Sequence, residues 1–417
     1  MSPETSLARP AGGPQTGPVA DLLAVGDGTA VRRRRRWTTP VAGIAVAAVA
    51  VVLAGRAGGS PDPPPPVAVD GPEISVRPAP NPGRTSPAPE PVARLDGDPG
   101  PARPGLRLVL GGDRPGVLDL GTGRLTAFPG LPARPGDTVE VRRTGRTTAL
   151  LVTNPAEPDA RAYVLPDGGR AVDLGPVRDA LPLRDGTVLT VRCATGAPGC
   201  LLAARSATGA RLWQRGLPRA ARLVRETLLG VVLWVYDGGS GGGQVRIEDP
   251  RSGQPTRRLG RTYAVLTADQ RHVAYQPLGC QYDCPIVVTA LADGSRRTLP
   301  VAPGAATTAT FSPDGRWLAV GFQGLDPWYA SPGADRDGHL AVADLAAGTW
   351  HRMPGLTTAA HNTPLPVWTG TGELLVAAGR DGDNRFVAWT VGAPRITVLP
   401  IRIGRTLLRP DMVALLD

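Results

Sequence analysis

One long segment brings aromatic and acidic side chains together. It reads GFQGLDPWYASPGADRDG from Gly321 to Gly338, and it lacks the alternation of apolar and polar residues that is typical of a β-strand. A Trp-Tyr pair beside carboxylates can stack on a sugar ring or hold a peptide, although both rings can equally pack the loop against a neighbouring one. The candidate ligand-binding residues here are Asp326, Trp328, Tyr329, Asp335 and Asp337.

Two Asp-x-Asp pairs offer the oxygen ligands that calcium prefers. They are Asp335/Asp337 and Asp381/Asp383, the second followed by Asn384. Neither pair lies in a complete calcium-binding loop, and clustered Asp and Gly are ordinary turn residues. We therefore expect no metal site and no cofactor.

The four cysteines form two closely spaced pairs. Cys193 and Cys200 bracket one expected hairpin loop, and Cys280 and Cys284 bracket another. Outside the cytoplasm this spacing favours two local disulfides, Cys193–Cys200 and Cys280–Cys284. A four-cysteine zinc site is the alternative, but the spacings are wider than C-x₂-C and export disfavours free thiolates.

Three catalytic motifs are absent from the sequence: H-E-x-x-H, a P-loop and a dinucleotide fingerprint. Its four histidines are not spaced as metal ligands; only His361, beside Asn362, is retained as a candidate binding residue. No catalytic residue is assigned, and the sequence leans away from an enzyme.

The net charge of +10 does not indicate a nucleic-acid-binding protein. All 46 basic residues are arginines, which is typical of a GC-rich coding bias, and the basic residues beyond residue 105 form no stripe with interleaved aromatics. We expect no nucleic-acid partner.

The amino-terminal region predicts a membrane anchor. Residues 1–36 form a polar, disordered tail that ends in five arginines, and an apolar run follows from Trp37 to Gly55. Nineteen helical residues span about 28 Å, close to the hydrocarbon thickness of a bilayer. The arginines keep the amino terminus in the cytoplasm and place the remainder outside it. A cleaved signal peptide is the alternative.

A proline-rich linker separates this span from the rest of the chain. Residues 56–105 include four consecutive prolines, Pro63 to Pro66, and favour polyproline II rather than a compact fold. The domain that follows, residues 106–417, would stand clear of the membrane.

A repeat of strand, glycine turn and strand organises residues 106–417. The turn glycines are Gly123, Gly169, Gly209, Gly253, Gly294, Gly348 and Gly392. Their average spacing of about 45 residues matches a four-stranded propeller blade. We predict an all-β, seven-bladed β-propeller, with six or eight blades as alternatives.

The two ends of this domain complement one another. The first repeat starts at Leu106 without its inner strands, and the chain ends in a further strand-like run, DMVALLD. We predict that the tail supplies the missing strand or strands and closes the ring without a free sheet edge.

Two blades resemble known repeats. FSPDGRWLAV, from Phe311 to Val320, resembles the repeat of TolB-type, WD-repeat-like propellers found outside the bacterial cytoplasm, and SATGARLWQRG from Ser206 resembles the blade motif of pyrroloquinoline-quinone-type propellers. The whole layout is similar to that of actinobacterial membrane proteins with one span and an exported propeller. These resemblances imply the fold and not an activity.

Loop lengths predict where a binding site lies. Connections between the second and third strand of each blade vary most and share one face of a propeller. We expect a membrane-anchored binding or scaffold module for a protein, peptide or glycan of the cell envelope. The alternatives are a lyase or glycosidase with carboxylates at the channel mouth, and signal transduction through the cytoplasmic tail.

Overall fold

The computed structural model describes the part of the chain that follows the linker. The described residues are 100–134, 136–157, 159–166, 169–237, 242–279, 284–300, 305–323, 338–358, 363–380, 383–404 and 413–416. All belong to the second of two units, Gly83–Asp417. Among them there is no helix that could cross a membrane, and the expected span, residues 37–55, lies outside them.

The described residues form strands grouped in antiparallel sheets, and five of these sheets have four strands. The first contains β1 (Arg107–Leu110), β2 (Gly116–Asp119), β3 (Leu125–Ala127) and β27 (Val413–Leu416). The next two contain β4 (Thr138–Thr144), β5 (Thr147–Thr153), β6 (Ala160–Leu165) and β7 (Val172–Val177), then β8 (Asp179–Pro182), β9 (Val188–Arg192), β10 (Gly199–Arg205) and β11 (Arg211–Pro218). The last two contain β19 (Ala305–Phe311), β20 (Trp317–Gln323), β21 (His339–Asp344) and β22 (Thr349–Arg352), then β23 (Leu365–Trp368), β24 (Leu374–Arg380), β25 (Asp383–Trp389) and β26 (Thr397–Gly404).

The sixth sheet has seven strands because one strand serves two hairpins. Its members are β12 (Ala221–Thr227), β13 (Gly230–Tyr236), β14 (Gly243–Glu248), β15 (Pro255–Ala268), β16 (His272–Pro277), β17 (Val287–Ala290) and β18 (Arg296–Thr298). The first half of β15 pairs with β14 and its second half with β16. The fourteen-residue β15 therefore joins two four-stranded groups without a turn.

The last strand of the chain completes the first sheet. β27 pairs antiparallel with β1, and Leu110 lies opposite Val413. The predicted closure is confirmed, with one strand supplied by the tail. The preceding strand-like run, VLPIRI from Val398 to Ile403, is part of β26 in its own sheet.

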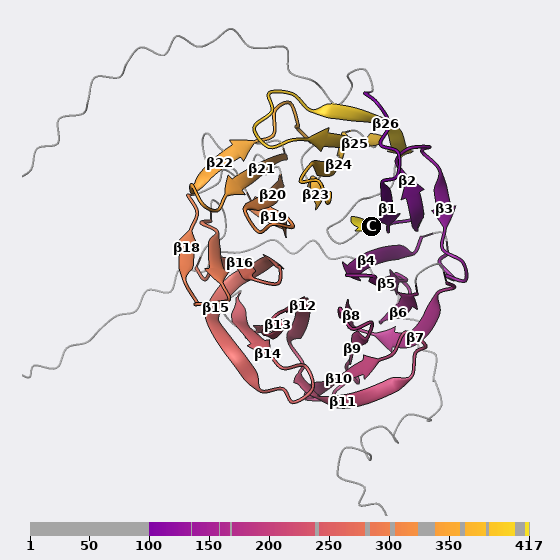
Figure 1. The fold of residues 1–417 in the computed structure, drawn as a ribbon. Coiled ribbons are helices and arrows are strands. Elements are labelled where there is room, and N and C mark those ends of the chain that lie inside the picture. Colours follow the sequence, from indigo (N-terminus) through magenta and orange to yellow (C-terminus); the bar gives the residue numbers. More distant parts are fainter. Residues whose placement is uncertain are drawn as a thin grey trace, which may run out of the picture. The chain divides into compact units, whose positions relative to one another are not determined.

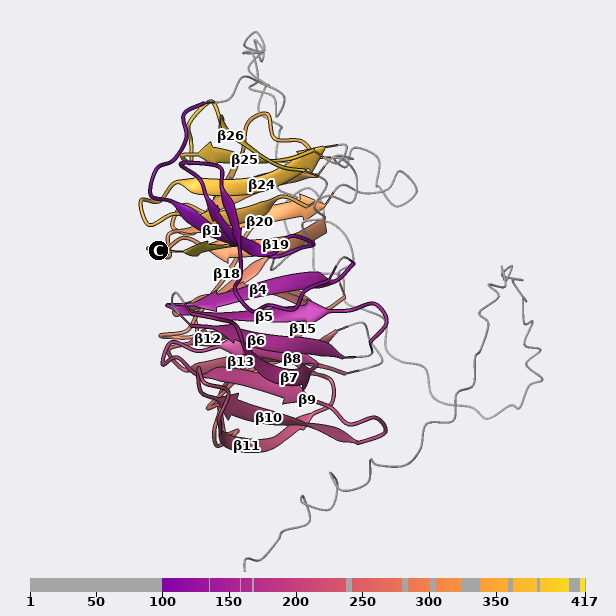
Figure 2. The same cartoon turned by 90° about the vertical axis from the view of Figure 1, so that its right-hand side faces the viewer.

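The innermost strands of the sheets surround a common centre (Figure 1). In ring order, β4, β8, β12, β15, β19, β23 and β27 each contact the next, and β27 contacts β4. In the perpendicular view the sheet of β4–β7 lies beside the sheet of β8–β11 (Figure 2). Radial four-stranded sheets around an axis are the architecture of a β-propeller.

The core lies between neighbouring sheets rather than inside any one of them. One cluster packs Leu189 and Leu202 against Leu223 and Leu233 of the following sheet. Period-two alternation produces these clusters, because each sheet presents one apolar face to each neighbour.

The predicted glycine turns recur between the third and fourth strands. In four of them the glycine N–H donates to the carbonyl four residues earlier, and the glycine has a positive φ; these glycines are Gly123, Gly253, Gly294 and Gly348. Gly209 and Gly392 also have positive φ. Gly169 has no positive φ, and its N–H donates to the Pro166 carbonyl three residues earlier, in a tighter turn. This repeat therefore departs from the predicted pattern.

Candidate functional site

The predicted ligand-binding residues fall outside the described part of the chain. This holds for Asp326, Trp328, Tyr329, Asp335, Asp337 and His361. They stay predictions. The connections that were expected to vary in length do join the second and third strands of the sheets, as between β9 and β10.

One predicted disulfide is confirmed. Cys193 and Cys200 are bonded across the connection between β9 and β10, with their Cα atoms 4.2 Å apart. No described cysteine has a free thiol. Cys284 is buried, but Cys280 lies outside the described residues, and their pairing stays a prediction.

A cavity of about 950 Å³ occupies the centre of the ring, and all seven innermost strands contribute to its lining. It has two chemically different halves. The β19, β23 and β27 side presents hydroxyl and apolar side chains such as Thr310 and Val367. The side formed by β4, β8, β12 and β15 presents six arginines: Arg142, Arg143, Arg184, Arg222, Arg225 and Arg271.

The lining carries an excess of positive charge. Among the described lining residues, two carboxylates, Asp269 and Asp314, stand against the six arginines. Two more acids, Asp179 and Glu226, lie next to the lining through contacts with Arg142 and Arg184. Counting all four acids still leaves two positive charges in excess, in a concave site where the field is screened less than at the surface.

Arg142 ties three innermost strands together. Its guanidinium pairs with Asp179 Oδ1 at 2.8 Å and donates to the carbonyls of Ala180 and Leu223. Asp179 Oδ2 accepts in turn from the Leu223 N–H at 2.8 Å. Both side chains are largely buried, so this pair is a fixed part of the cavity wall.

Arg225 links its own strand to two others. From β12 it donates to the carbonyl of Arg143 on β4 and to that of Ala268 on β15. Main-chain carbonyls thus help to hold the Arg225 guanidinium at the cavity wall.

Arg184 and Arg271 lie at one mouth of the cavity. Each is in the turn that leads from an innermost strand to the second strand of its sheet, and each is exposed. The Arg184 N–H donates to Glu226 Oε2 at 2.7 Å, and Gln270 Nε2 donates to the Glu226 carbonyl. Within the described residues, neither arginine side chain makes a hydrogen bond or ion pair.

Glu226 carries a carboxyl group with a raised pKa beside this mouth. Burial raises the pKa of Glu226, and the hydrogen bond and positive charge of Arg184 oppose this effect. With a raised pKa, Glu226 loses its negative charge at a higher pH than an ordinary glutamate does. Once it is protonated, it no longer offsets the positive charge of the arginines.

The two carboxylates of the lining are committed to turns. Asp269 Oδ1 accepts from the N–H groups of Arg271 and His272. Asp314 accepts from Ser312 Oγ at 2.5 Å and from the Arg316 N–H, and these hydrogen bonds lower the pKa of Asp314. An ionised, turn-bound carboxylate is a poor general acid.

The Asp269, His272 and Ser312 side chains do not form a hydrolytic triad. His272 Nδ1 lies 3.3 Å from Asp269, but Ser312 Oγ is buried, donates to Asp314 and accepts from the Trp317 N–H. His272 also packs against Phe311, as a structural residue does. Within the described residues no group of three or more His, Cys, Asp or Glu could hold a metal ion.

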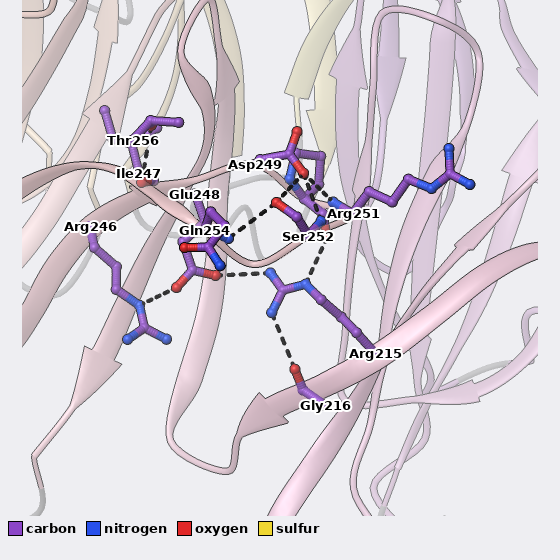
Figure 3. Close-up of polar contacts among 11 residues, drawn as sticks. Arg215, Gly216, Arg246, Ile247, Glu248, Asp249, Arg251, Ser252, Gln254 and Thr256 are labelled. Carbon is purple, nitrogen blue, oxygen red and sulfur yellow. Dashed lines mark hydrogen bonds and ion pairs between the residues drawn. The ribbon is translucent and has the colours of Figure 1, made fainter. Parts of the chain in front are cut away.

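A second polar cluster lies away from the cavity and joins two sheets (Figure 3). Glu248 on β14 is only 3% exposed and pairs with Arg215 of β11 at 2.8 Å and with Arg246 at 2.6 Å. The Arg246 Nε–H does not point at the carboxylate, so that contact is an ion pair without a hydrogen bond. Arg215 also donates to the Pro250 carbonyl. Each of its three guanidinium nitrogens donates a hydrogen bond inside the protein, which indicates a structural clamp.

Sequence reasoning missed the arginines of the cavity. The available signal was the placement of arginines inside apolar strand runs, as in VEVRRT and ARLVRET. That signal is visible only once these runs are known to be innermost strands.

No known protein family matches this sequence, and no curated protein does. Several solved structures share its architecture. TolB from Acinetobacter baumannii is 14% identical, covering 67% of this chain and 66% of TolB at a TM-score of 0.40. The β-propeller domain of the trilobed protease from Pyrococcus furiosus is 11% identical. The match covers 64% of this chain and 86% of the protease domain, at a TM-score of 0.42. Prolyl oligopeptidase B from Galerina marginata is 11% identical. The match covers 69% of this chain and 46% of the peptidase, at a TM-score of 0.48.

These likenesses concern the fold alone. The chain spans less than two thirds of TolB and about half of the Galerina peptidase. Activity, substrates and partners must be argued from this chain's own residues.

Proposed function

We propose that this protein is a membrane-anchored, TolB-like β-propeller of seven blades that binds a partner at the outer face of the membrane. The blade number is supported by the closed succession of innermost strands, with β15 counted in two blades. The anchor is supported by the arginine run and the apolar residues 37–55.

The observation that carries a binding role is the central cavity. Arg142 and Arg225 make hydrogen bonds between its innermost strands, and its lining combines charged, hydroxyl and apolar groups. A concave site with few well-placed polar groups is suited to ligand binding.

A lyase or glycosidase is less well supported. Such an enzyme needs two carboxylates flanking one bond, with the acid kept protonated. The carboxylates of the described cavity wall are capped by their turns, and arginines outnumber them.

The experiment uses the full chain with a carboxyl-terminal tag in intact cells. We expect it to stay in the membrane fraction during an alkaline carbonate wash, and the tag to be removed by protease added outside the cells. We also expect the detergent-solubilised chain to bind one fraction of the envelope, protein or glycan, in a saturable manner. Release in the wash, or a protected tag, would contradict the anchor. Absence of saturable binding to every fraction would contradict the binding role.

A further inference from the structure

Positive charge is concentrated in one sheet of the ring. Residues 178–220, which carry the sheet of β8–β11, contain seven arginines against two aspartates, a net charge of +5. Residues 106–417 contain 35 arginines against 27 acids, a net charge of +8, so this one sheet supplies more than half of the excess. Of its two aspartates, Asp179 is buried against Arg142, and Asp185 lies in the turn between β8 and β9.

Three of these arginines gather at the other end of the sheet, beside the loop between β9 and β10. Arg192 ends β9 directly before Cys193, Arg178 precedes β8, and Arg219 follows β11. Because the strands are antiparallel, these three positions share one end of the sheet. All three residues are exposed, and none lines the central cavity. We call Arg178, Arg192 and Arg219 the arginine patch.

Two guanidinium groups of the patch are held against the disulfide-closed loop. Arg219 Nη1 donates to the Ala197 carbonyl at 3.3 Å, inside the loop that the Cys193–Cys200 bond closes. Arg178 Nη1 donates to the Arg219 carbonyl and lies 3.9 Å from Cys193 Sγ. Cys200 Sγ lies 3.7 Å from the same Arg219 carbonyl. These contacts place both guanidinium groups at one loop, and each accepting group is an uncharged carbonyl.

The loops of the neighbouring sheets do not neutralise the arginine patch. In the following sheet, Asp237 pairs with Arg261. In the preceding sheet, Glu157 and Asp159 are exposed on the corresponding loop. In the part of the chain that the structure describes, no carboxylate forms an ion pair with the patch.

We propose that the arginine patch is a docking surface for an acidic segment of another protein. Guanidinium groups bind carboxylates through paired, charge-assisted hydrogen bonds, and arginine is enriched at protein interfaces. The loop beside the patch reads ATGAPG from Ala194 to Gly199, and these small residues let a polypeptide approach closely. Since the disulfide already restrains this loop, little conformational freedom is lost on binding. The patch lies outside the cavity and adds a second surface to the proposed function.

The test measures binding of a labelled oligoglutamate peptide to the full chain in detergent by fluorescence anisotropy, at low and at high salt. We expect binding at low salt that weakens as salt screens the exposed charges. The double variant Arg178→Gln/Arg219→Gln should bind the peptide about tenfold more weakly, since two charge-assisted contacts are lost. Arg192→Gln should weaken binding about threefold and leave the unfolding temperature unchanged, because within the described residues the Arg192 side chain makes no hydrogen bond or ion pair.

The matched control is Arg124→Gln/Arg251→Gln, which removes the same charge from exposed turns between third and fourth strands, at the opposite face of the ring. It should leave the affinity within about twofold. Equal weakening by both double variants, absence of peptide binding at low salt, or tighter binding of a polyphosphate of equal charge would overturn the proposal. If Arg178→Gln/Arg219→Gln also lowers the unfolding temperature, Arg192→Gln decides: weakened peptide binding supports the docking surface, and unchanged binding overturns it.

Discussion

Single residues in this protein decide whether neighbouring sheets stay joined. Glu248 is the clearest case, because a nearly inaccessible carboxylate meets arginines from two strands (Figure 3). A buried ion pair adds little over an apolar contact, but breaking one leaves uncompensated charge. Glu248 therefore matters because its removal would leave the guanidinium groups of Arg215 and Arg246 without their counter-charge.

Replacing Glu248 by Ala should lower the free energy of unfolding by about 2–3 kcal/mol, because two partly buried guanidinium groups lose their counter-charge. The exposed pair Arg161–Asp173 provides the comparison, with side chains 49% and 42% exposed. Asp173→Ala should cost under about 1 kcal/mol. Urea titrations of both variants measure the difference. Equal losses would show that Glu248 is no clamp.

Asp344 should make stability depend on pH. The turn N–H of Ala347 is the main cause of its lowered pKa, with Arg316 and Ala346 contributing. A carboxyl whose folded pKa is depressed contributes stability above its unfolded pKa of about 3.9, and this contribution is lost as the pH falls through the folded value.

Asp344→Asn should therefore destabilise the protein more at pH 7 than at pH 3, as measured by urea unfolding at the two values. Asp159→Asn, at an exposed position, serves as the control and should change stability little at either pH. A loss for Asp344→Asn that is the same at pH 3 and pH 7 would contradict this assignment.

At the scale of elements, the turn between the third and fourth strands is the repeating device. Gly253 has a φ of 74°, and a Cβ there would lie 3.0 Å from Arg215 Nη1. The turn at Gly253 thus connects two strands of its own sheet and also contacts Arg215 of the preceding sheet. Gly294 stands in a similar relation to Arg257, at 3.2 Å.

Gly253→Ala should lower the free energy of unfolding by about 1–2 kcal/mol from left-handed backbone strain, and somewhat more from displacing Arg215. Gly392→Ala isolates the strain, since its φ is 85° and a Cβ would have open space. Gly216→Ala, with neither feature, should be neutral or slightly stabilising. Thermal unfolding of the three variants checks this order. A neutral Gly253→Ala would contradict it.

For the domain as a whole, closure depends on the four residues of β27. They pair with β1 and contact β23 and β4, and three of them, Val413, Ala414 and Leu415, line the cavity. Without them β1 becomes a free edge, and exposed edges invite pairing between molecules. The same strand therefore serves stability, solubility and the binding site.

Deleting residues 413–417 should lower the free energy of unfolding by more than about 4 kcal/mol and promote self-association. Deleting Asp417 alone should do neither. Chemical unfolding and sedimentation velocity of the full chain in detergent measure both effects. A shortened protein that unfolds like the wild type as a monomer would show that the first sheet closes without β27.

The sequence by itself determined the class of fold, the order of the strands, the turn glycines other than Gly169, the Cys193–Cys200 disulfide and the origin of the closing strand. All of these follow from local patterns: alternation, φ preferences at glycine, and a spacing repeated along the chain. Only the tertiary structure decided that Arg143, Arg184, Arg225 and Arg271 share one cavity and that Glu248 joins two sheets. Those neighbours come from different strands, up to about 130 residues apart, and one-dimensional periodicity states which face a residue occupies but not what lies opposite it.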